Sequence, residues 1–433
     1  MNLESYRQIA QRAIQSLPSE HGDWLIEKRL AAIRQMSDLG IPDARQEAWR
    51  YTSVEGLTAK TFQFDNLVLD ATFDSPELSP LNEPVAARLV FIDGIYNPAL
   101  SVGDGQHGCK ITSLRSAMAE GDQSVLLSVA KLSGVGDHLF TALNMATVQD
   151  GAVIKLSPGV IIEHPVELLH ITTNRSDSHG RQLRHLVELD KGASVSLIER
   201  YLSISDDTDY FNNVVCEISL AEGAELRHQR LQQEGELAYH LSNVHVELGQ
   251  GARYQAVNAA LGGAWSRTEL HNGFSGKDAE LDVAGLYAAG DGQLTDFHLD
   301  VDHAVPHCTS RENFKGILYG AGRAVFDGLI QVQVDAQQSE AHLHNANLML
   351  STQAEVDTKP QLVILADDVK CSHGTSVGQL DQEALFYLRS RGIDAAQARR
   401  ILCLGFVGEI IDKFETPSLR EQINSDLLQR MRF

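Results

Sequence analysis

Side chains that can bind a soft or borderline metal ion are densest in the final third of the sequence. Cys371 and His373 are separated by one residue, so in an extended strand their side chains point to the same face. A thiolate and an imidazole suit iron or an iron–sulfur cluster, but two ligands make an incomplete site. The remaining ligands would come from elsewhere in the chain or from a partner. The other members of this group are His303, His307, Cys308, His342 and His344.

A purely structural interpretation stands beside the metal-binding one. A histidine in a strand is usually a hydrogen-bonded surface or core residue, and this interpretation is favoured for the four histidines between 303 and 344. Cys216, Cys308 and Cys403 lie in apolar surroundings and are expected to be small core residues. From the residues alone, the pair Cys371/His373 stays open between a site and two ordinary strand residues.

The sequence lacks the two common nucleotide-binding motifs. The segment Gly273-Phe-Ser-Gly276-Lys277-Asp lacks the upstream spacing and the hydroxyl of a phosphate-binding loop. There is no GxGxxG after a strand, so a dinucleotide site is not predicted. We therefore expect a protein that is not an enzyme.

The amino-acid composition indicates which kind of partner and which cellular compartment to expect. The 433 residues include 58 acids against 36 Lys and Arg, a net charge of −22, which disfavours nucleic acid as a partner. The five cysteines lie far apart without a CxxC pair, as in a reducing cytoplasm. No secretory signal and no apolar run of membrane-spanning length are present, so a cytoplasmic protein without membrane contact is expected.

The elements that must position these residues fall into three parts. Residues 4–40 have helical spacing, ended by Gly40 and Pro42, and residues 60–85 are typical of an irregular linker. From about 87 to 366, short runs rich in Val, Ile and Leu between turn residues predict strands. After residue 380 the helical pattern returns, with Asp381 and Asp394 as expected N-caps, Gly392 as an end, and Ser418 with Glu421 as an expected capping box.

A weak repeat runs through the strand region. Leu-x-x-Gly-Ala occurs at Gly192, Gly223 and Gly251, spaced by 31 and 28 residues. A glycine permits a tightly bent corner, and the alanine after it lets layers stack closely. This period favours a β-solenoid, although a β-sandwich accounts for the same strands almost as well.

Several blocks of the sequence resemble the SufB/SufD family of iron–sulfur cluster assembly proteins. The most specific block is Ala366-Asp-Asp-Val-Lys-Cys-Ser-His-Gly374, followed by Leu385-Phe-Tyr-Leu-Arg-Ser-Arg-Gly392. Trp49-Arg-Tyr-Thr52 is similar to the N-terminal signature of the family. Within the family the chain resembles D-type and not B-type members, because Asn345-Ala-Asn-Leu-Met-Leu stands where B-type chains carry a cysteine. Thr375-Ser376 departs mildly from the usual Ala-Thr.

This resemblance implies a mainly β fold. A right-handed parallel β-helix core, residues 86–378, would be flanked by an N-terminal helical domain with a linker, residues 1–85. A C-terminal helical domain, residues 379–433, would dock an ATPase.

The implied function is that of a non-catalytic scaffold subunit. It would pair with a SufB-like paralog and dock a SufC-type ATPase, or form a homodimer when isolated. His373 would help to hold a nascent iron–sulfur cluster at the interface, a transient cluster that this chain alone does not bind tightly. Cys371 is either a second ligand or a strand residue. The candidate ATPase contacts are Phe386, Tyr387, Arg389, Arg391 and Phe406.

Three alternatives remain open at this level. Phe386 and Phe406 could pack the C-terminal helices together instead of contacting a partner. The chain could be a purely structural adaptor in which His373 binds nothing. It could also be a β-helix carbohydrate-active enzyme, although such enzymes need paired carboxylates in a groove, and no acidic pair recurs along the repeat.

Overall fold

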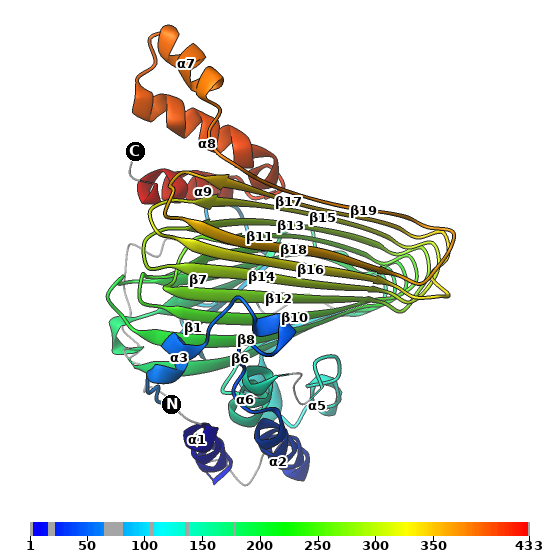
Figure 1. The fold of residues 1–433 in the computed structure, drawn as a ribbon. Helices are drawn as coiled ribbons and strands as arrows, with labels where there is room; N and C mark the ends of the chain where they lie inside the picture. Colours follow the sequence, from blue (N-terminus) through cyan, green and yellow to red (C-terminus); the bar gives the residue numbers. More distant parts are fainter. Residues whose placement is uncertain are drawn as a thin grey trace.

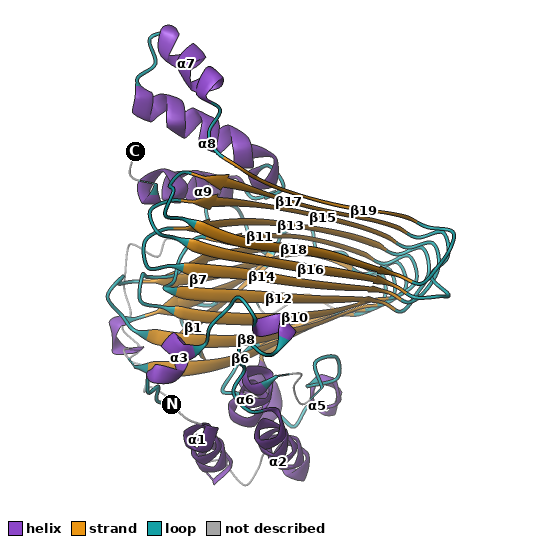
Figure 2. Ribbon diagram, viewed as in Figure 1, coloured by secondary structure: helices purple, strands orange, loops and turns teal. Residues whose placement is uncertain are grey.

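The computed structural model contains a long stack of strands with helices at both ends (Figure 1). It describes residues 3–15, 22–64, 81–103, 108–134, 138–176 and 178–431. Most of the predicted linker, residues 65–80, lies outside these described residues. The predicted class, mainly β with helical segments on both sides, is confirmed (Figure 2). None of the described helices is long and apolar enough to cross a membrane.

The described helices and strands have the following bounds. The helices are α1 (Leu3–Gln15), α2 (Gly22–Leu39), α3 (Glu55–Ala59), α4 (Leu114–Ala119), α5 (Gln123–Ser128), α6 (Leu139–Thr147), α7 (Gln382–Ser390), α8 (Ala395–Ile411) and α9 (Pro417–Arg430). The first strands are β1 (Ala87–Ile92), β2 (Ile95–Tyr96), β3 (Cys109–Ser113), β4 (Ala152–Leu156), β5 (Val166–Thr172), β6 (His179–Leu189), β7 (Ser194–Ser203), β8 (Tyr210–Leu220), β9 (Glu225–Gln233) and β10 (Tyr239–Leu248). The later strands are β11 (Arg253–Ala260), β12 (Trp265–Phe274), β13 (Glu280–Ala289), β14 (Leu294–His303), β15 (Thr309–Leu318), β16 (Arg323–Val332), β17 (Glu340–Met349), β18 (Glu355–Ile364) and β19 (Lys370–Gly378).

The strands form two sheets that the chain visits alternately. One sheet has the order β19-β17-β15-β13-β11-β9-β7-β5-β1-β2, and the other has the order β18-β16-β14-β12-β10-β8-β6-β4-β3. From β5 onward, neighbours pair in parallel, so each coil of the chain adds one strand to each sheet. One column of partners runs through Tyr254, Leu281, Ser310, Ala341 and Cys371. This in-register stacking is a parallel β-solenoid, and it excludes the sandwich.

The predicted glycine corners are confirmed. Gly192, Gly223 and Gly251 have φ of 65°, 65° and 62°, a left-handed conformation that glycine adopts without strain. Each follows an even-numbered strand, and the alanine after each glycine is buried. The N–H of Gly223 donates to the carbonyl of Gln250, next to Gly251, at 2.8 Å, so successive corners are joined by hydrogen bonds.

Three further corners carry no glycine and were therefore missed by the repeat. Asp278, His307 and Gln338 have φ of 61°, 62° and 61° and occupy the same place between an even and an odd strand. A small buried residue follows each of them, as at the glycine corners: Ala279, Cys308 and Ser339. The solenoid therefore continues beyond the part of the repeat that is visible in the sequence.

Helices cover the first coils. The predicted N-terminal helices are confirmed as α1 and α2, and Gly40 ends α2 with φ of 71°. They pack against α6, which with α4 and α5 interrupts the strand region between β3 and β4. The sequence pattern missed these three helices because the longest, α6, has only 9 residues. Figure 1 shows this group of helices at the end of the solenoid that carries β6 and β8.

The last helices lie elsewhere: α8 and α9 pack on the outer face of the sheet that contains β7, β9, β13 and β15, and α7 extends away from the solenoid (Figure 1). The caps at Asp381 and Asp394 are confirmed, because their side chains accept hydrogen bonds from the first N–H groups of α7 and α8. The capping box at Ser418 is wrong: α9 begins at Pro417 after Thr416, and both the N–H and the hydroxyl of Ser418 donate to Glu83. The carboxylate of Glu83, which is distant in the sequence, is therefore the partner of Ser418 in place of Glu421.

A substitution at a glycine corner tests whether the corner requires a left-handed backbone. Space is open around Gly223, so its left-handed φ, and not crowding, limits the side chain there. We expect Gly223→Val to lower the free energy of unfolding by about 1–2 kcal/mol or more, because a β-branched residue is disfavoured at positive φ. Gly223→Asn should cost less, since asparagine tolerates this conformation. Urea unfolding followed by circular dichroism checks this, and equal losses for both variants would contradict it.

Candidate functional site

The last strand, β19, positions Cys371 and His373. In the pairing with β17, Cys371 lies opposite Ala341 and His373 lies opposite Leu343. Ala341 and Leu343 are buried in the solenoid core, and partners in register point to the same side of a sheet. Both predicted side chains therefore share the inner face, as their spacing indicated.

The inner face is uncovered at this point because the stack ends there. β19 and β18 are the terminal strands of their sheets, each with one neighbour. His373 is exposed, while Cys371 is half-buried and packs against the core. Large apolar side chains are also exposed on or next to these two strands: Val363, Ile364, Leu365 and Val377. We call this uncovered inner face of β18 and β19 the open end.

The Cys371 thiol is held in its protonated form. Burial raises the pKa of Cys371, a hydrogen bond with the backbone of Ala341 opposes this, and the carboxyl group of Glu312 adds to the rise. A metal ion must therefore displace a proton before this sulfur can serve as a ligand.

The other histidines and cysteines of the group do not join this pair. His303 is buried, stacks on Phe274 at 4.5 Å between ring centres, and lies 2.9 Å from the Ser310 hydroxyl through Nε2. Its burial lowers its pKa to about 4, so it is neutral. Cys308 is buried, which agrees with the structural interpretation. Among the described residues, no three His, Cys, Asp or Glu side chains are already placed to hold a metal ion.

The histidines of β17 and the corner histidine face elsewhere. His342 pairs with Ser372, on the outer face, and its Nδ1 lies 2.8 Å from the Ser372 hydroxyl. His344 is exposed on the same outer face, beside Gly374. His307 occupies a left-handed corner. The sheet thus separates His342 and His344 from Cys371 and His373.

Glu312 is a residue of this region that the sequence analysis missed. It lies on β15, in the column that continues through Leu343 to His373. It is only 2% exposed, and neither carboxyl oxygen has a hydrogen-bond partner of good geometry among the described residues. Burial raises the pKa of Glu312 to about 8 despite the nearby Ser310 hydroxyl, so the group is a neutral acid near pH 7. In the sequence, Glu312 stands midway between Ser310 and Phe314, which face inward, so the alternation of a strand places the glutamate on the same inward face.

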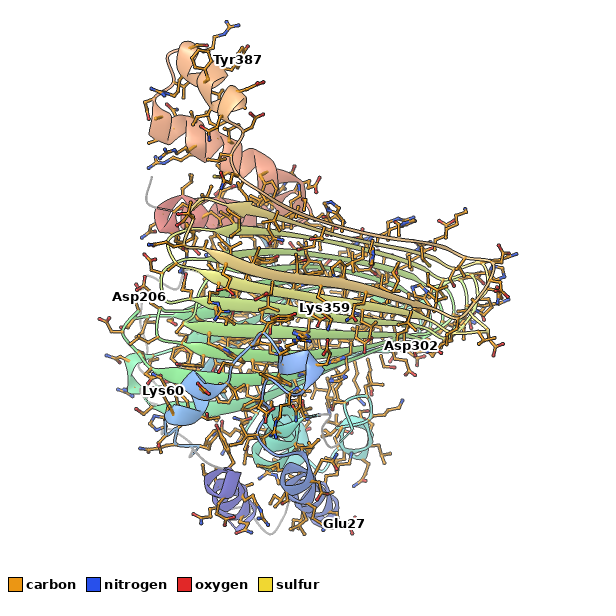
Figure 3. The ribbon with its side chains drawn as sticks, in the orientation of Figure 1. Glu27, Lys60, Asp206, Asp302, Lys359 and Tyr387 are labelled. Carbon is orange, nitrogen blue, oxygen red and sulfur yellow. The ribbon has the colours of Figure 1, made fainter. Side chains whose placement is uncertain are left out.

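The C-terminal candidates fall into two groups. Phe386 and Tyr387 on α7 are 73% and 57% exposed, so the packing interpretation is wrong for Phe386. Arg389 and Arg391 are exposed nearby, and Figure 3 shows Tyr387 at the tip of the molecule, away from the solenoid. Phe406 is half-buried against the core of α8 and α9, as the packing interpretation expected.

Lys315 fastens α8 to the solenoid at this point. Its ammonium group lies 5.0 Å from the centre of the Phe406 ring and donates to the Phe406 carbonyl at 2.7 Å. It also forms an ion pair of 2.8 Å with Glu409. Since Lys315 belongs to β15, the C-terminal helices are attached to the strand that carries Glu312.

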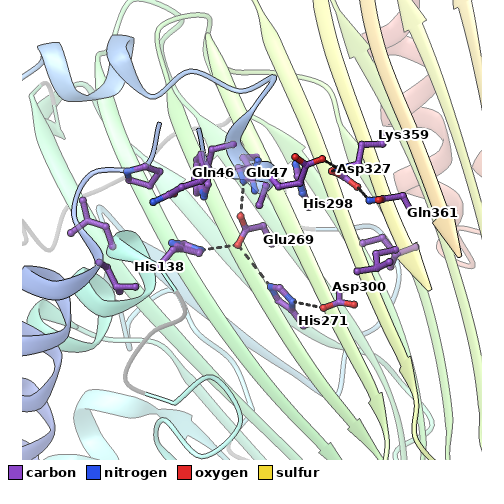
Figure 4. Close-up of a pocket in the computed structure, with 18 of the residues that line it drawn as sticks. Gln46, Glu47, His138, Glu269, His271, His298, Asp300, Asp327, Lys359 and Gln361 are labelled. Carbon is purple, nitrogen blue, oxygen red and sulfur yellow. Dashed lines mark hydrogen bonds and ion pairs between the residues drawn. The ribbon is translucent and has the colours of Figure 1, made fainter. Parts of the chain in front are cut away.

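A cavity of about 470 Å³ lies between residues 39–49 and the outer face of the sheet that contains β12 and β18 (Figure 4). Its charged groups are engaged with one another. Glu269 contacts Arg267 at 2.6 Å and His138 at 2.7 Å, and Lys359 bridges to Glu47 at 2.6 Å. The Lys359–Glu47 pair joins the N-terminal segment to the outside of this sheet, whereas Cys371 and His373 lie on the inner face of the other sheet.

The neutral state of Glu312 predicts a pH dependence of stability. An unfolded glutamate releases its proton near pH 4.5 and the folded one near pH 8, so the stability of the folded protein falls as pH rises between these values. Glu312→Gln removes this loss, and we expect the variant to gain stability relative to the wild type by up to about 1.4 kcal/mol per pH unit in that window.

Urea unfolding at pH 5, 6.5 and 8 measures the difference in the free energy of unfolding between Glu312→Gln and the wild type. Glu340→Gln is the matched control, because Glu340 is partly exposed on the next strand and paired with Lys370 at 2.6 Å. If this difference for Glu312→Gln does not increase between pH 5 and 8, the carboxyl group of Glu312 is not neutral in the folded protein.

Comparisons with known proteins agree with this architecture. A family model described as "SUF system FeS cluster assembly, SufBD core domain" matches residues 170–406, and one for the "SufBD protein N-terminal region" matches residues 1–168. An iron–sulfur cluster assembly SufBD family protein of Synechocystis is 32% identical over 92% of this chain and 89% of its own length. The iron–sulfur cluster assembly protein SufD of Escherichia coli is 31% identical over 92% of this chain and 91% of its own length. SufD of Bacillus subtilis is 22% identical over the full length of both chains. The protein therefore belongs to the SufBD family, whose members take part in iron–sulfur cluster assembly by the SUF system.

Proposed function

We propose that this protein is a non-catalytic, D-type scaffold subunit for iron–sulfur cluster assembly. The observation that carries this proposal is the placement of Cys371 and His373 side by side on the uncovered last strand. A sulfur and a nitrogen ligand lie there where the inner face of the solenoid meets solvent. Within a family of cluster assembly proteins, such a pair is suited to hold iron or a cluster.

The partner at the open end is a SufB-like paralog in this proposal. Unpaired backbone groups of β18 and β19 can pair with strands of another chain, and unprotected edges of this kind favour association. The exposed apolar side chains from Val363 to Leu365 would be buried by such a partner. Without the paralog, a second copy of this chain could occupy the same surface and give a homodimer.

The incomplete ligand set suits a cluster that is passed on. His373, with Cys371 as a second candidate, would share a transient iron–sulfur cluster with ligands of the paralog. Because this chain supplies at most two ligands, the partner must fill the remaining coordination positions of the iron. A rearrangement of the interface would therefore change the affinity for the cluster. This chain alone would bind no cluster tightly.

The tip of α7 would dock a SufC-type ATPase. Exposed aromatic and arginine side chains are the usual anchors of protein interfaces, and α7 presents both kinds away from the solenoid. Arg391 donates to the Tyr387 hydroxyl at 3.2 Å and lies 5.2 Å from the centre of its ring, which holds the two side chains together. Phe406 would support α8 from beneath and would not contact the partner directly.

The net charge of −22 supports a protein partner and not nucleic acid, and the five cysteines, none of them in a disulfide, suit a reducing cytoplasm. A purely structural adaptor has the same partners but no working ligand at His373. The two functions differ in cluster loading.

A histidine variant separates these two functions. The chain is co-expressed with its B-type and ATPase partners, and wild type is compared with His373→Ala by gel filtration and by iron–sulfur absorbance after anaerobic reconstitution. We expect unchanged assembly and at least a tenfold weaker hold on the cluster, because one ligand is lost. His342→Ala is the matched control, since His342 is exposed on the outer face one strand away. If His373→Ala loads the cluster like the control, the chain is an adaptor only.

A second pair of variants tests the docking surface. Tyr387→Ala should weaken ATPase binding at least tenfold, about 1.4 kcal/mol, as for an interface anchor. Leu127→Ala on α5 is the control, because Leu127 is 76% exposed at the other end of the molecule. Calorimetric titration of the ATPase gives both affinities. Equal affinities for the two variants would remove Tyr387 from the interface.

A further inference from the structure

A chain of hydrogen bonds reaches the open end from the interior of the solenoid. The Tyr287 hydroxyl donates to Oδ1 of Asn347 at 2.6 Å, and Nδ2 of Asn347 donates to Oδ1 of Asn345 at 2.7 Å. The Thr358 hydroxyl donates to the same Asn345 oxygen at 2.9 Å and lies 3.0 Å from the Thr375 hydroxyl. Tyr287 and both asparagines are buried, whereas Thr375 is exposed on β19. The chain of hydrogen bonds therefore ends on the last strand.

The strand register places Thr375 beside His373. Thr375 lies opposite the buried Asn345, so its side chain points to the inner face. Thr358 lies opposite Phe326, a core residue of the other sheet. The two hydroxyls thus meet across the interior at the last coil. Because Thr375 follows His373 by two residues, their side chains are neighbours on one face of β19.

The number of hydrogen atoms fixes the direction of these hydrogen bonds. A threonine hydroxyl has one hydrogen atom, and the side-chain oxygen of asparagine only accepts. The hydrogen of Thr358 is used by Asn345, so Thr375 is the donor in the pair of hydroxyls. The hydrogen of Thr375 is then used as well. Thr375 therefore presents only lone pairs at the open end, where it can accept a hydrogen bond but cannot donate a further one.

His373 is the neighbour on β19 that can donate to Thr375. The other neighbour on the same face, Val377, has no side-chain donor. Residues two apart in a strand are separated by about 6.6 Å, and a histidine ring that lies along the strand brings a ring N–H within reach of the threonine oxygen. None of the hydrogen bonds found among the described residues uses the exposed His373 ring, so this ring can turn toward Thr375.

We propose that Thr375 is a positioning residue for His373: its oxygen accepts one ring N–H and so leaves the other ring nitrogen to bind iron. A histidine that binds a metal ion usually donates its second N–H to a fixed acceptor, which sets the tautomer and the orientation of the ring. Thr358 and Asn345 fix the acceptor here. The inference rests on the proposed function, in which a partner covers the open end and excludes the water that would otherwise accept this N–H.

A tie between strands is the other use of the same two hydroxyls. β19 has one neighbouring strand, and the contact of Thr375 with Thr358 joins it to the opposite sheet. Such a tie depends equally on both threonines. Positioning depends on Thr375 itself, because its oxygen still accepts an N–H after Thr358 is replaced.

Variants of Thr375 test the contact with His373. The chain is loaded with a cluster anaerobically in the complex with its B-type and ATPase partners. Loss of iron to a chelator is followed by absorbance, and the reduction potential is measured by a dye-mediated titration. Thr375→Val should lose iron at least tenfold faster and shift the potential to more positive values, because an imidazole whose N–H lacks an acceptor donates less charge to iron. Thr375→Ser, which keeps the hydroxyl, should match the wild type.

Two controls separate positioning from the tie between strands. Thr358→Val breaks the tie but keeps the Thr375 oxygen, so iron loss and potential should stay closer to the wild type than to Thr375→Val. In a His373→Ala background, Thr375→Val should have no further effect, since the ring that it positions is gone. Thr375→Ala serves in the same way if valine disturbs assembly of the complex.

The outcomes distinguish this inference from the proposed function. If Thr375→Val leaves iron loss and potential unchanged while His373→Ala weakens cluster binding, Thr375 does not position the ligand, and the cluster site stands. Equal effects of Thr375→Val and Thr358→Val, without rescue by Thr375→Ser, would reduce the two hydroxyls to a tie between strands. If His373→Ala binds the cluster like the wild type, both the proposed function and this inference fail.

Discussion

The structure depends on the in-register stacking of parallel coils. Each strand gives its backbone donors and acceptors to the strand of the next coil, and each corner from Gly192 to Gln338 must bend in the left-handed conformation to return the chain in register. A stack of this kind has two ends where the pairing stops. Helices α1, α2 and α6 cover the first coils, while β18 and β19 remain uncovered. The open end is therefore where an inward-facing side chain can meet solvent.

The interior of this solenoid is not uniformly apolar. Toward the first coils, buried charges occur in partnered sets, such as Glu199 with Arg230 and His228, and Glu234 with His240 at 2.7 Å. Such sets are tolerated because each charge is compensated in the low-dielectric interior. Elsewhere in the interior, burial makes ionisable groups neutral: His170 and His185 in the first coils and His303 in a late coil have lowered pKa values, and Glu312 has a raised one.

The C-terminal helices are joined to this same region. Lys315 holds Phe406 and Glu409 of α8, and it lies on β15 three residues after Glu312. The outer face of β15 therefore carries the attachment of the docking helices, and its inner face carries the unpartnered acid. One strand connects the exposed tip of α7 with the coils beneath Cys371 and His373.

The sequence by itself determined the features that depend on local chemistry. Glycine corners, the caps at Asp381 and Asp394, and the common face of Cys371 and His373 follow from backbone preferences and from the two-residue period of a strand. The tertiary structure alone decided the features that depend on distant neighbours. Stacking holds Asp278, His307 and Gln338 in a conformation that their side chains do not favour, and Glu83 takes Ser418 away from a local cap. The burial of Glu312 and the outward position of His342 depend on the pairing of β15, β17 and β19, because the register across strands decides what surrounds each residue.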